Sequence, residues 1–150
     1  MKIVGIIPSR YKSRRFPGKP LAPIMGIPMV GHVYFRSKMS KLLDEVYIAT
    51  CDEEVMDYAA SIGAKCVMTS DAHERACDRT AEAMLKIEDQ TGGRIDILVM
   101  VQGDEPMVTH DMLRRAVDPM LTDETVGVVN LMNEFESRDE HADPNEVKVV

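Results

Sequence analysis

Short apolar segments alternate with amphipathic segments along most of the chain. Residues 2–8 (KIVGIIP) are apolar at almost every position, and this pattern is typical of a parallel strand that helices cover on both faces. Similar short segments predict further strands, at 45–50, 65–68, 95–101, 125–132 and 146–150. Apolar residues at helical spacing predict helices between strands, at 28–41, 53–62, 77–90 and 109–120.

The order of these elements indicates an α/β fold with a mostly parallel sheet and helices on both of its faces. Strands that alternate with helices are joined by right-handed crossovers, and this arrangement gives a nucleotide-binding type of α/β layer. No internal repeat, low-complexity tract or linker interrupts the chain, so we expect residues 1–150 to form one domain.

Polar residues and glycines predict where the helices begin and end. Thr50 and Glu53 have the spacing of a capping box, and Thr109 has a side chain suited to an N-cap. Gly63 and Gly92 predict helix ends, because glycine readily adopts the left-handed conformation that often follows a helix.

The composition excludes several classes of protein. Of the 150 residues, 45% are hydrophobic and 29% are charged, which is typical of a globular domain with a sizeable core. No apolar segment approaches the roughly 20 residues that span a bilayer, and the N-terminus does not resemble a secretory signal. Cys51, Cys66 and Cys77 fit neither a disulfide framework nor a metal knuckle. We therefore expect a cytoplasmic protein with reduced thiols and no membrane partner.

The net charge of −7 hides a strong asymmetry. Residues 1–43 contain nine Lys or Arg and no Asp or Glu, so the positive charge is local. A nucleic-acid partner is disfavoured, because the chain is acidic overall and has only 5% aromatic residues and no Trp. A small polyanion bound in one pocket fits this charge distribution better.

A basic loop directly follows the first strand. Arg10, Ser13, Arg15 and Lys19 lie within ten residues, and their side chains, together with backbone N–H groups, could hold a triphosphate. The loop is not a Walker motif, because its spacing differs and Pro20 follows the lysine. A solvated basic loop without a ligand is the alternative interpretation.

The stretch VQGDEP, residues 101–106, follows the most apolar predicted strand. Gly103 allows a sharp turn that presents Asp104, whose carboxylate could hold Mg²⁺ against phosphate oxygens. An ordinary acidic turn is the alternative. The carboxyl ends of parallel strands meet at one edge of a sheet, so this loop and the basic loop are expected to converge in one crevice.

The stretches IIPSRYKSRRFPGKPL (6–21) and VQGDEP closely resemble bacterial 3-deoxy-manno-octulosonate cytidylyltransferases, also called CMP-Kdo synthetases. The likeness extends to GIPMVGHV, ATCDEE and DPNEVKVV, and so covers the whole chain. It implies a Rossmann-like nucleotide-binding domain of the nucleotide-diphospho-sugar transferase type. It also implies a sugar nucleotidyltransferase that transfers CMP from CTP to the anomeric hydroxyl of an acidic sugar and releases pyrophosphate. It also implies Mg²⁺ as cofactor, a homodimer and a place in lipopolysaccharide biosynthesis.

The resemblance implies a role for individual residues. The nucleotide would be bound by Pro8, Ser9, Arg10, Ser13, Arg15, Lys19 and Gln102, with main-chain groups of residues 8–10 reading the cytosine. Catalytic roles would fall to Arg10, Lys19 and Asp104, with Asp104 also holding the metal. No protein nucleophile is needed for this reaction, so neither Cys77 nor a histidine has to act as one.

The residues that face the acceptor are expected in the loop and helix start after the third strand. His73, Arg75 and Arg79 are the candidates, with a surface cap as the alternative for His73 and Arg79. The family typically has Ser-Gly-Thr where this chain has Arg75-Ala76-Cys77. The gained guanidinium would suit a smaller or more anionic acceptor, such as another 2-keto sugar acid or a phosphonate.

The family also continues beyond the position of Val150, into a section with a second metal-binding Asp, more sugar contacts and much of the dimer interface. We therefore expect this chain to lack the family's C-terminal part. Three functions stay open on the sequence alone: a cytidylyltransferase acting on a Kdo-like acid, a related nucleotidyltransferase with another acidic acceptor, and a non-catalytic nucleotide-binding module.

Overall fold

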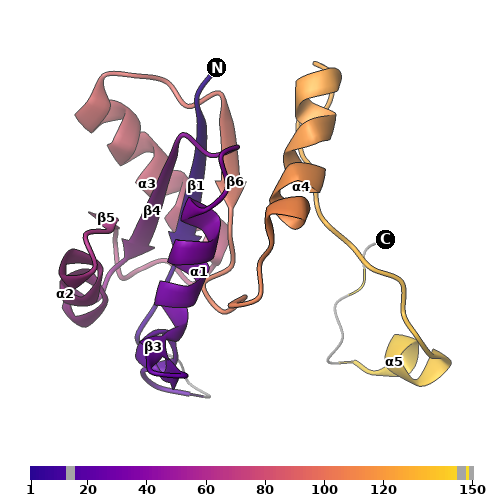
Figure 1. Ribbon diagram of the computed structural model, residues 1–150, viewed down its shortest axis with the longest axis horizontal. Coiled ribbons are helices and arrows are strands. Elements are labelled where there is room, and N and C mark those ends of the chain that lie inside the picture. Colours follow the sequence, from indigo (N-terminus) through magenta and orange to yellow (C-terminus); the bar gives the residue numbers. More distant parts are fainter. Residues whose placement is uncertain (13–15, 145–147, 149–150) are drawn as a thin grey trace.

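A four-stranded parallel sheet forms the centre of the protein in a computed structural model that describes residues 1–12, 16–144 and 148. Its strands are β1 (Ile3–Pro8), β4 (Glu45–Thr50), β5 (Lys65–Met68) and β6 (Ile97–Met100), in the order β5-β4-β1-β6 (Figure 1). Ile6 of β1 lies opposite Tyr47 of β4 and Met100 of β6. The predicted α/β class and parallel sheet are confirmed.

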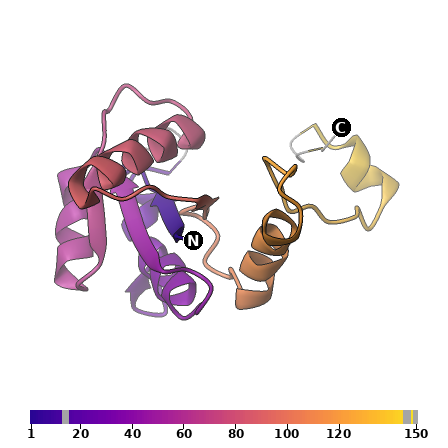
Figure 2. The ribbon, with the colours of Figure 1, turned by 90° about the horizontal axis from the view of Figure 1, so that it is seen from above.

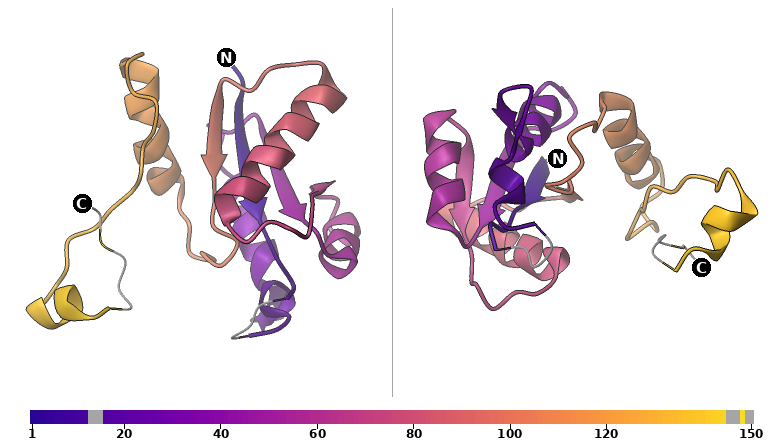
Figure 3. Two further views of the ribbon diagram at one scale, coloured as in Figure 1. Left: turned by 180° about the vertical axis from the view of Figure 1, so that it is seen from behind. Right: turned by 90° about the horizontal axis from the view of Figure 1, so that it is seen from below.

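Helices cover both faces of the sheet. α1 (Met29–Lys38) and α2 (Glu53–Ser61) pack on one face, and α3 (Ala76–Thr91) crosses the other (Figures 1 and 3). α4 (His110–Thr122) contacts β6 and α1. Among the described residues, none of the helices combines the length and the apolar character needed to cross a membrane.

The two faces of β1 explain why its sequence is apolar throughout. Ile3 and Ile7 are buried in the core cluster that includes side chains of α1, α2 and α4. Val4 and Ile6 point to the opposite face and are buried in the cluster that includes α3. Successive side chains of a strand alternate between the faces of its sheet, so a central strand between two helical layers must be apolar at every position.

Three of the predicted helix ends have the expected geometry, including Gly63, which follows the C-cap of α2 with a φ of 65°, and one predicted cap is wrong. Thr109 is the N-cap of α4, and its hydroxyl accepts a hydrogen bond from the backbone N–H of Met112. Gly92 ends α3 with a φ of 65°. Thr50 does not cap α2: it is the last residue of β4, and its hydroxyl accepts from the backbone N–H of Asp52.

The segment after α4 differs from its predicted structure. Residues 125–132 form no strand, and the side chains of Val128 and Met132 are each 78% exposed. The segment leads away from the sheet to a short helix, α5 (Arg138–Ala142), which buries none of its residues (Figure 2). An apolar pattern alone does not make a strand, because a strand needs a partner for its backbone hydrogen bonds. The strand expected at 146–150 falls, apart from Lys148, outside the described residues.

A small hairpin between β1 and α1 was not predicted. η1 (Lys19–Leu21) leads into β2 (Pro23–Ile24), which pairs antiparallel with β3 (Ile27–Pro28). The turn between the two strands is formed by Met25, with a φ of 49°, and Gly26, with a φ of 87°. The hairpin returns the chain from the basic loop to the start of α1.

Candidate functional site

A pocket opens at the edge of the sheet where β1 and β6 end. All four strands of the sheet are parallel, so the loops that follow them emerge at the same edge. The pocket is lined by residues of the first loop, the start of α1 and the loop after β6: Pro8, Ser9, Arg10, Lys19, Pro20, Met29, Gln102, Gly103 and Asp104.

Two local contacts hold the described part of the basic loop. At its start, the backbone N–H of Tyr11 donates to Oδ2 of Asp52 at 2.7 Å. Near its end, the backbone N–H of Gly18 donates to the carbonyl of Tyr11 at 2.9 Å, and Gly18 has a φ of 76°. This left-handed residue turns the chain into η1, so that Lys19 comes back to the mouth of the pocket.

The loop after β6 lies directly against the end of β1. A Cβ atom on Gly103 would come within 2.6 Å of the carbonyl oxygen of Pro8, a backbone contact that a side chain cannot avoid by rotating. The backbone N–H of Glu105 donates to the carbonyl of Gln102 at 3.1 Å and closes the turn. Gly103 thus permits the approach that brings Asp104 to the same pocket as the basic loop.

The two loops are joined by one ion pair. Lys19 Nζ lies 2.7 Å from Asp104 Oδ2, although the two residues are 85 positions apart. The side chains are 37% and 51% exposed, respectively, so ligands in the pocket can reach both charged groups. A cation and a carboxylate therefore meet where the sequence predicted a triphosphate and a metal.

Two more polar groups of the pocket are available to a ligand. Ser9 is only 5% exposed, and its hydroxyl is buried without a hydrogen-bond partner in the described part of the chain. Arg10 is exposed and its guanidinium has no ion-pair partner among residues 1–12, 16–144 and 148. A buried hydroxyl without a partner is costly, and a ligand with a polar oxygen would satisfy it.

Most of the predicted nucleotide site is brought together. The residues concerned are Pro8, Ser9, Arg10, Lys19, Gln102 and Asp104, all of which line the pocket. Ser13 and Arg15 lie outside the described residues. The sequence did not indicate that Pro20 and Met29 line the pocket, because neither side chain has a charged or strongly polar group that would bind a nucleotide. Asp52, which fixes the start of the basic loop, was missed as well; its position at the end of β4 was the available signal.

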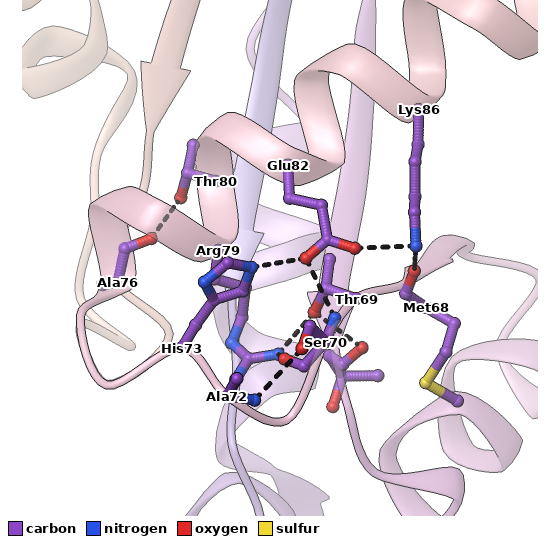
Figure 4. Close-up of polar contacts among 11 residues, drawn as sticks. Met68, Thr69, Ser70, Ala72, His73, Ala76, Arg79, Thr80, Glu82 and Lys86 are labelled. Carbon is purple, nitrogen blue, oxygen red and sulfur yellow. Dashed lines mark hydrogen bonds and ion pairs between the residues drawn. The ribbon is translucent and has the colours of Figure 1, made fainter.

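Two of the three candidates for the acceptor site, His73 and Arg79, belong to a separate network around the loop after β5 (Figure 4). Arg79 of α3 is 3% exposed, and its Nη1 donates to the hydroxyl of Thr69 and, at 3.3 Å, to the carbonyl of Ser70. The Thr69 hydroxyl in turn donates to the carbonyl of Thr50 at 3.0 Å. Arg79 Nη2 is buried without a partner in the part of the chain that the structure describes.

Glu82 holds the same loop from the next turn of α3. It accepts a hydrogen bond from the backbone N–H of Ser70 at 2.9 Å, contacts His73 Nε2 and pairs with Lys86 at 2.7 Å. Chiefly the bond from Lys86, then those from Ser70 and His73, lower the pKa of Glu82 to about 2, against an ordinary value of 4.5. Glu82 is therefore ionised at neutral pH and fastens the loop to the helix.

None of the three acceptor candidates lines the pocket between β1 and β6. His73 and Arg79 have partners within the loop network, whereas Arg75, at the N-cap of α3, is exposed and its side chain has no partner among the described residues. Arg75 is thus the exposed cation among the three acceptor candidates.

Metal-binding clusters and reactive thiols are the other features that could support catalysis. No cluster of three or more His, Cys, Asp or Glu side chains able to hold a metal occurs within the described ranges. All three cysteines are free thiols, and burial raises the pKa of Cys66 to about 11, which keeps it protonated. Asp104 is the carboxylate of the pocket, so a metal there would need further oxygen ligands from a bound molecule.

Comparison with known proteins identifies the family. A sequence profile described as cytidylyltransferase matches residues 4–150. The chain belongs to the cytidylyltransferase family. The chain is 43% identical over 150 residues to the 3-deoxy-manno-octulosonate cytidylyltransferase of Geobacter metallireducens (strain ATCC 53774 / DSM 7210 / GS-15), an alignment that covers 100% of the chain and 57% of the relative. The resemblance inferred from the motifs is confirmed.

Solved structures agree with the family. The structure of CMP:2-keto-3-deoxy-manno-octonic acid synthetase complexed with CTP matches with a TM-score of 0.78 and 39% identity, over 84% of this chain and 50% of the other. A cytidylyltransferase from Leptospira borgpetersenii serovar Hardjo-bovis (strain JB197) matches with a TM-score of 0.68 and 26% identity, over 83% and 51% of the two chains. The chain thus spans about half the length of these relatives.

Proposed function

We propose that this chain is the nucleotide-binding part of an enzyme that transfers CMP from CTP to an acidic 2-keto sugar of the 3-deoxy-manno-octulosonate type. The observation that carries the proposal is the common pocket of two distant loops. Arg10 and Lys19 come from the loop after β1, and Gln102 and Asp104 come from the loop after β6. These are the loops that resemble the family, and a similar protein has been solved in complex with CTP.

The cations and the buried hydroxyl of the pocket would bind the triphosphate. Arg10 and Lys19, together with Arg15 and Ser13, would donate charge-assisted hydrogen bonds to the phosphate oxygens. The Ser9 hydroxyl, which has no partner within the described part, would donate another. Negative charge increases on the pyrophosphate as the bond from the α-phosphorus to the bridging oxygen breaks, so donors fixed at these positions lower the barrier.

Asp104 would hold a divalent metal, which we propose to be Mg²⁺. The donor set fits such an ion, because Mg²⁺ is commonly held by one or two carboxylates together with substrate phosphates. When bound, the metal would neutralise charge on the phosphate oxygens. Asp104 is 51% exposed at the pocket, so its carboxylate can contact a metal that arrives with a nucleotide.

The acceptor hydroxyl would attack the α-phosphorus, lose its proton to solvent and displace pyrophosphate. We propose Arg75 as the cation that attracts the acidic group of the acceptor, because it is exposed beside the sheet edge and has no side-chain partner among the described residues. His73 and Arg79 would support the acceptor side by holding the loop after β5 in place. A phosphonate is a second candidate acceptor, since the guanidinium of Arg75 would bind that group equally well.

The proposed reaction also bears on location, pathway and oligomeric state. A cytoplasmic location follows from the use of CTP, and a role in lipopolysaccharide biosynthesis follows from transfer to a Kdo-like acid. A homodimer is proposed from the family resemblance.

Nucleotide binding and pyrophosphate release test the proposal. We expect the chain to bind CTP more tightly than ATP or GTP in calorimetric titrations, because main-chain groups at residues 8–10 would lie too close to the base to admit a purine. Pyrophosphate release should then depend on an acidic 2-keto sugar in a panel that includes sugar acids and phosphonates. Equal affinity for all three nucleotides would contradict CTP as the proposed substrate. Pyrophosphate release with phosphonates alone would show that the acceptor is a phosphonate and not a 2-keto sugar acid.

A further inference from the structure

The ion pair between Lys19 and Asp104 joins two groups that the proposed function assigns to different ligands. Lys19 would bind a phosphate oxygen, and Asp104 would bind a metal. In the structure each is the partner of the other, at 2.7 Å, and neither has another ion-pair partner in the described part of the chain. The contact therefore has to be broken or rearranged when both ligands bind.

The metal and the triphosphate compete for different members of this ion pair: the metal for Asp104, and the triphosphate for Lys19. A divalent metal on Asp104 would lie about 2.1 Å from a carboxylate oxygen. The Lys19 ammonium already lies 2.7 Å from Oδ2. A metal on the same carboxylate would therefore lie close to the ammonium, and the two positive charges would repel each other strongly. A triphosphate has the opposite effect, because it offers the ammonium a more highly charged partner and leaves the carboxylate uncovered.

We propose that Lys19 occupies Asp104 until a triphosphate takes its ammonium, so that the pocket admits a divalent metal with the nucleotide rather than before it. This inference rests on the proposed function. It assigns Lys19 a second role, as an internal cation that prevents metal binding to the nucleotide-free pocket.

A second observation supports this order of binding. No other His, Cys, Asp or Glu side chains of the described residues assemble with Asp104 into a group able to hold a metal. The pocket therefore has one carboxylate to offer, and Lys19 covers it. Phosphate oxygens of the nucleotide would supply the remaining metal ligands and would also bind the Lys19 ammonium. Nucleotide binding would therefore complete the metal site and free the Asp104 carboxylate in the same step.

The expected coupling is modest, because both side chains are partly exposed to solvent. Exposed ion pairs typically change an equilibrium by about twofold to fivefold. Linkage makes the effect reciprocal: if the nucleotide raises the affinity for the metal through Lys19, the metal raises the affinity for the nucleotide by the same factor.

Titration of Mn²⁺ into the nucleotide-free chain, followed by the electron paramagnetic resonance of free Mn²⁺, tests the inference. Lys19→Gln should raise the affinity for Mn²⁺ about twofold to fivefold. Asp104→Asn should remove this binding both alone and in combination with Lys19→Gln. An unchanged or weaker affinity in Lys19→Gln would overturn the inference.

Arg10→Gln is the matched control, because it removes the same charge from the same pocket at a residue that has no carboxylate partner in the described ranges. It should change the Mn²⁺ affinity clearly less than Lys19→Gln does. An equal increase would mean that overall charge, rather than the ion pair, limits metal binding, and would also overturn the inference.

A separate titration with CTP keeps the two proposals distinguishable. If wild type binds no CTP, with or without Mn²⁺, the proposed function fails and nucleotide-coupled entry fails with it, even if Lys19→Gln still binds Mn²⁺ more tightly. If CTP binds but the Mn²⁺ affinity of the empty protein does not respond to Lys19→Gln, only the inference fails. Circular dichroism of each variant checks that the exposed substitutions leave the fold intact.

Discussion

Two loops at the same edge of the sheet use their positive charges differently. In the loop after β1, Arg10 is exposed without a partner among the described residues, and Lys19 has one partly exposed ion pair with Asp104. In the loop and helix start after β5, Arg79 is 3% exposed and His73 contacts Glu82. The first arrangement leaves cations available to a ligand, whereas the second uses them to build the protein.

The difference shows that the positions of basic residues in a sequence do not reveal which ones bind ligands. Both loops follow parallel strands, and both were expected to face the crevice. What separates them is the supply of internal acceptors: the loop after β5 has the Thr69 hydroxyl, the Ser70 carbonyl and the Glu82 carboxylate within reach. Ligand binding and stability should therefore respond in opposite ways to substitutions in the two loops.

The largest expected effect is on stability, in the loop after β5. Arg79→Leu should lower the free energy of unfolding by about 3 kcal/mol, because it removes the buried donor to Thr69 and Ser70. Arg75→Leu, at an exposed position of the same helix, is the control and should change it by less than about 0.5 kcal/mol. Urea denaturation of both variants measures the difference. Similar small effects would show that the guanidinium of Arg79 is not a structural group.

The next effect is on binding, in the loop after β1. Arg10→Ala should weaken CTP binding by about 1.5–3 kcal/mol, the typical contribution of a hydrogen bond to a charged group, and leave stability nearly unchanged. Arg94→Ala is the control, because Arg94 is also exposed but precedes β6 and so lies at the opposite edge of the sheet. Calorimetric titration with CTP compares the two. An equal loss of affinity in Arg94→Ala would point to a general charge effect.

The smallest expected effect concerns Glu82 and depends on pH. The pKa of Glu82 is lowered in the folded protein, from an ordinary 4.5 to about 2, so its contribution to stability is fully present above about pH 4.5 and is lost as the pH falls towards 2. Glu82→Gln should therefore destabilise the protein at neutral pH by about 1–2 kcal/mol, a value reduced for partial exposure. The difference between the two proteins should shrink between pH 4.5 and 2.

Urea denaturation at several pH values measures that difference. Asp111→Asn provides the comparison, because Asp111 also has a lowered pKa, caused mainly by Arg114, but lies on the exposed surface of α4. Its effect should be smaller than that of Glu82→Gln at neutral pH. A constant difference between wild type and Glu82→Gln over this range would contradict the assignment of Glu82 as an ionised anchor of the loop.

The sequence predicted the two inner strands of the sheet well because they are buried on both faces. β1 is apolar throughout and β4 is apolar between Glu45 and Thr50, a pattern that a central parallel strand requires. The segment 125–132 has a similar composition but no partner strand among the residues that the structure describes, and a sequence pattern contains no information on pairing. The hairpin of β2 and β3 was missed because each strand has two residues and Met25 is an unusual residue at a positive φ.

The sequence predicted those parts of the candidate site whose residues lie close together along the chain. Arg10 and Lys19 lie in one loop, and their convergence with Asp104 followed from the geometry of parallel strands. The ion pair itself did not follow, because it depends on the position of side chains 85 residues apart. The burial of Arg79 was also unexpected, since a basic residue on an amphipathic helix usually faces solvent.

The contact between Gly103 and the Pro8 carbonyl has a consequence for how this pocket can change. Part of its floor is main chain against main chain, and no substitution of a neighbouring side chain alters that shape. Mutational libraries aimed at a different nucleotide or acceptor should therefore leave residues 8 and 103 fixed and vary the rim. Tolerance to substitution should rise steeply from the floor of the pocket to its rim.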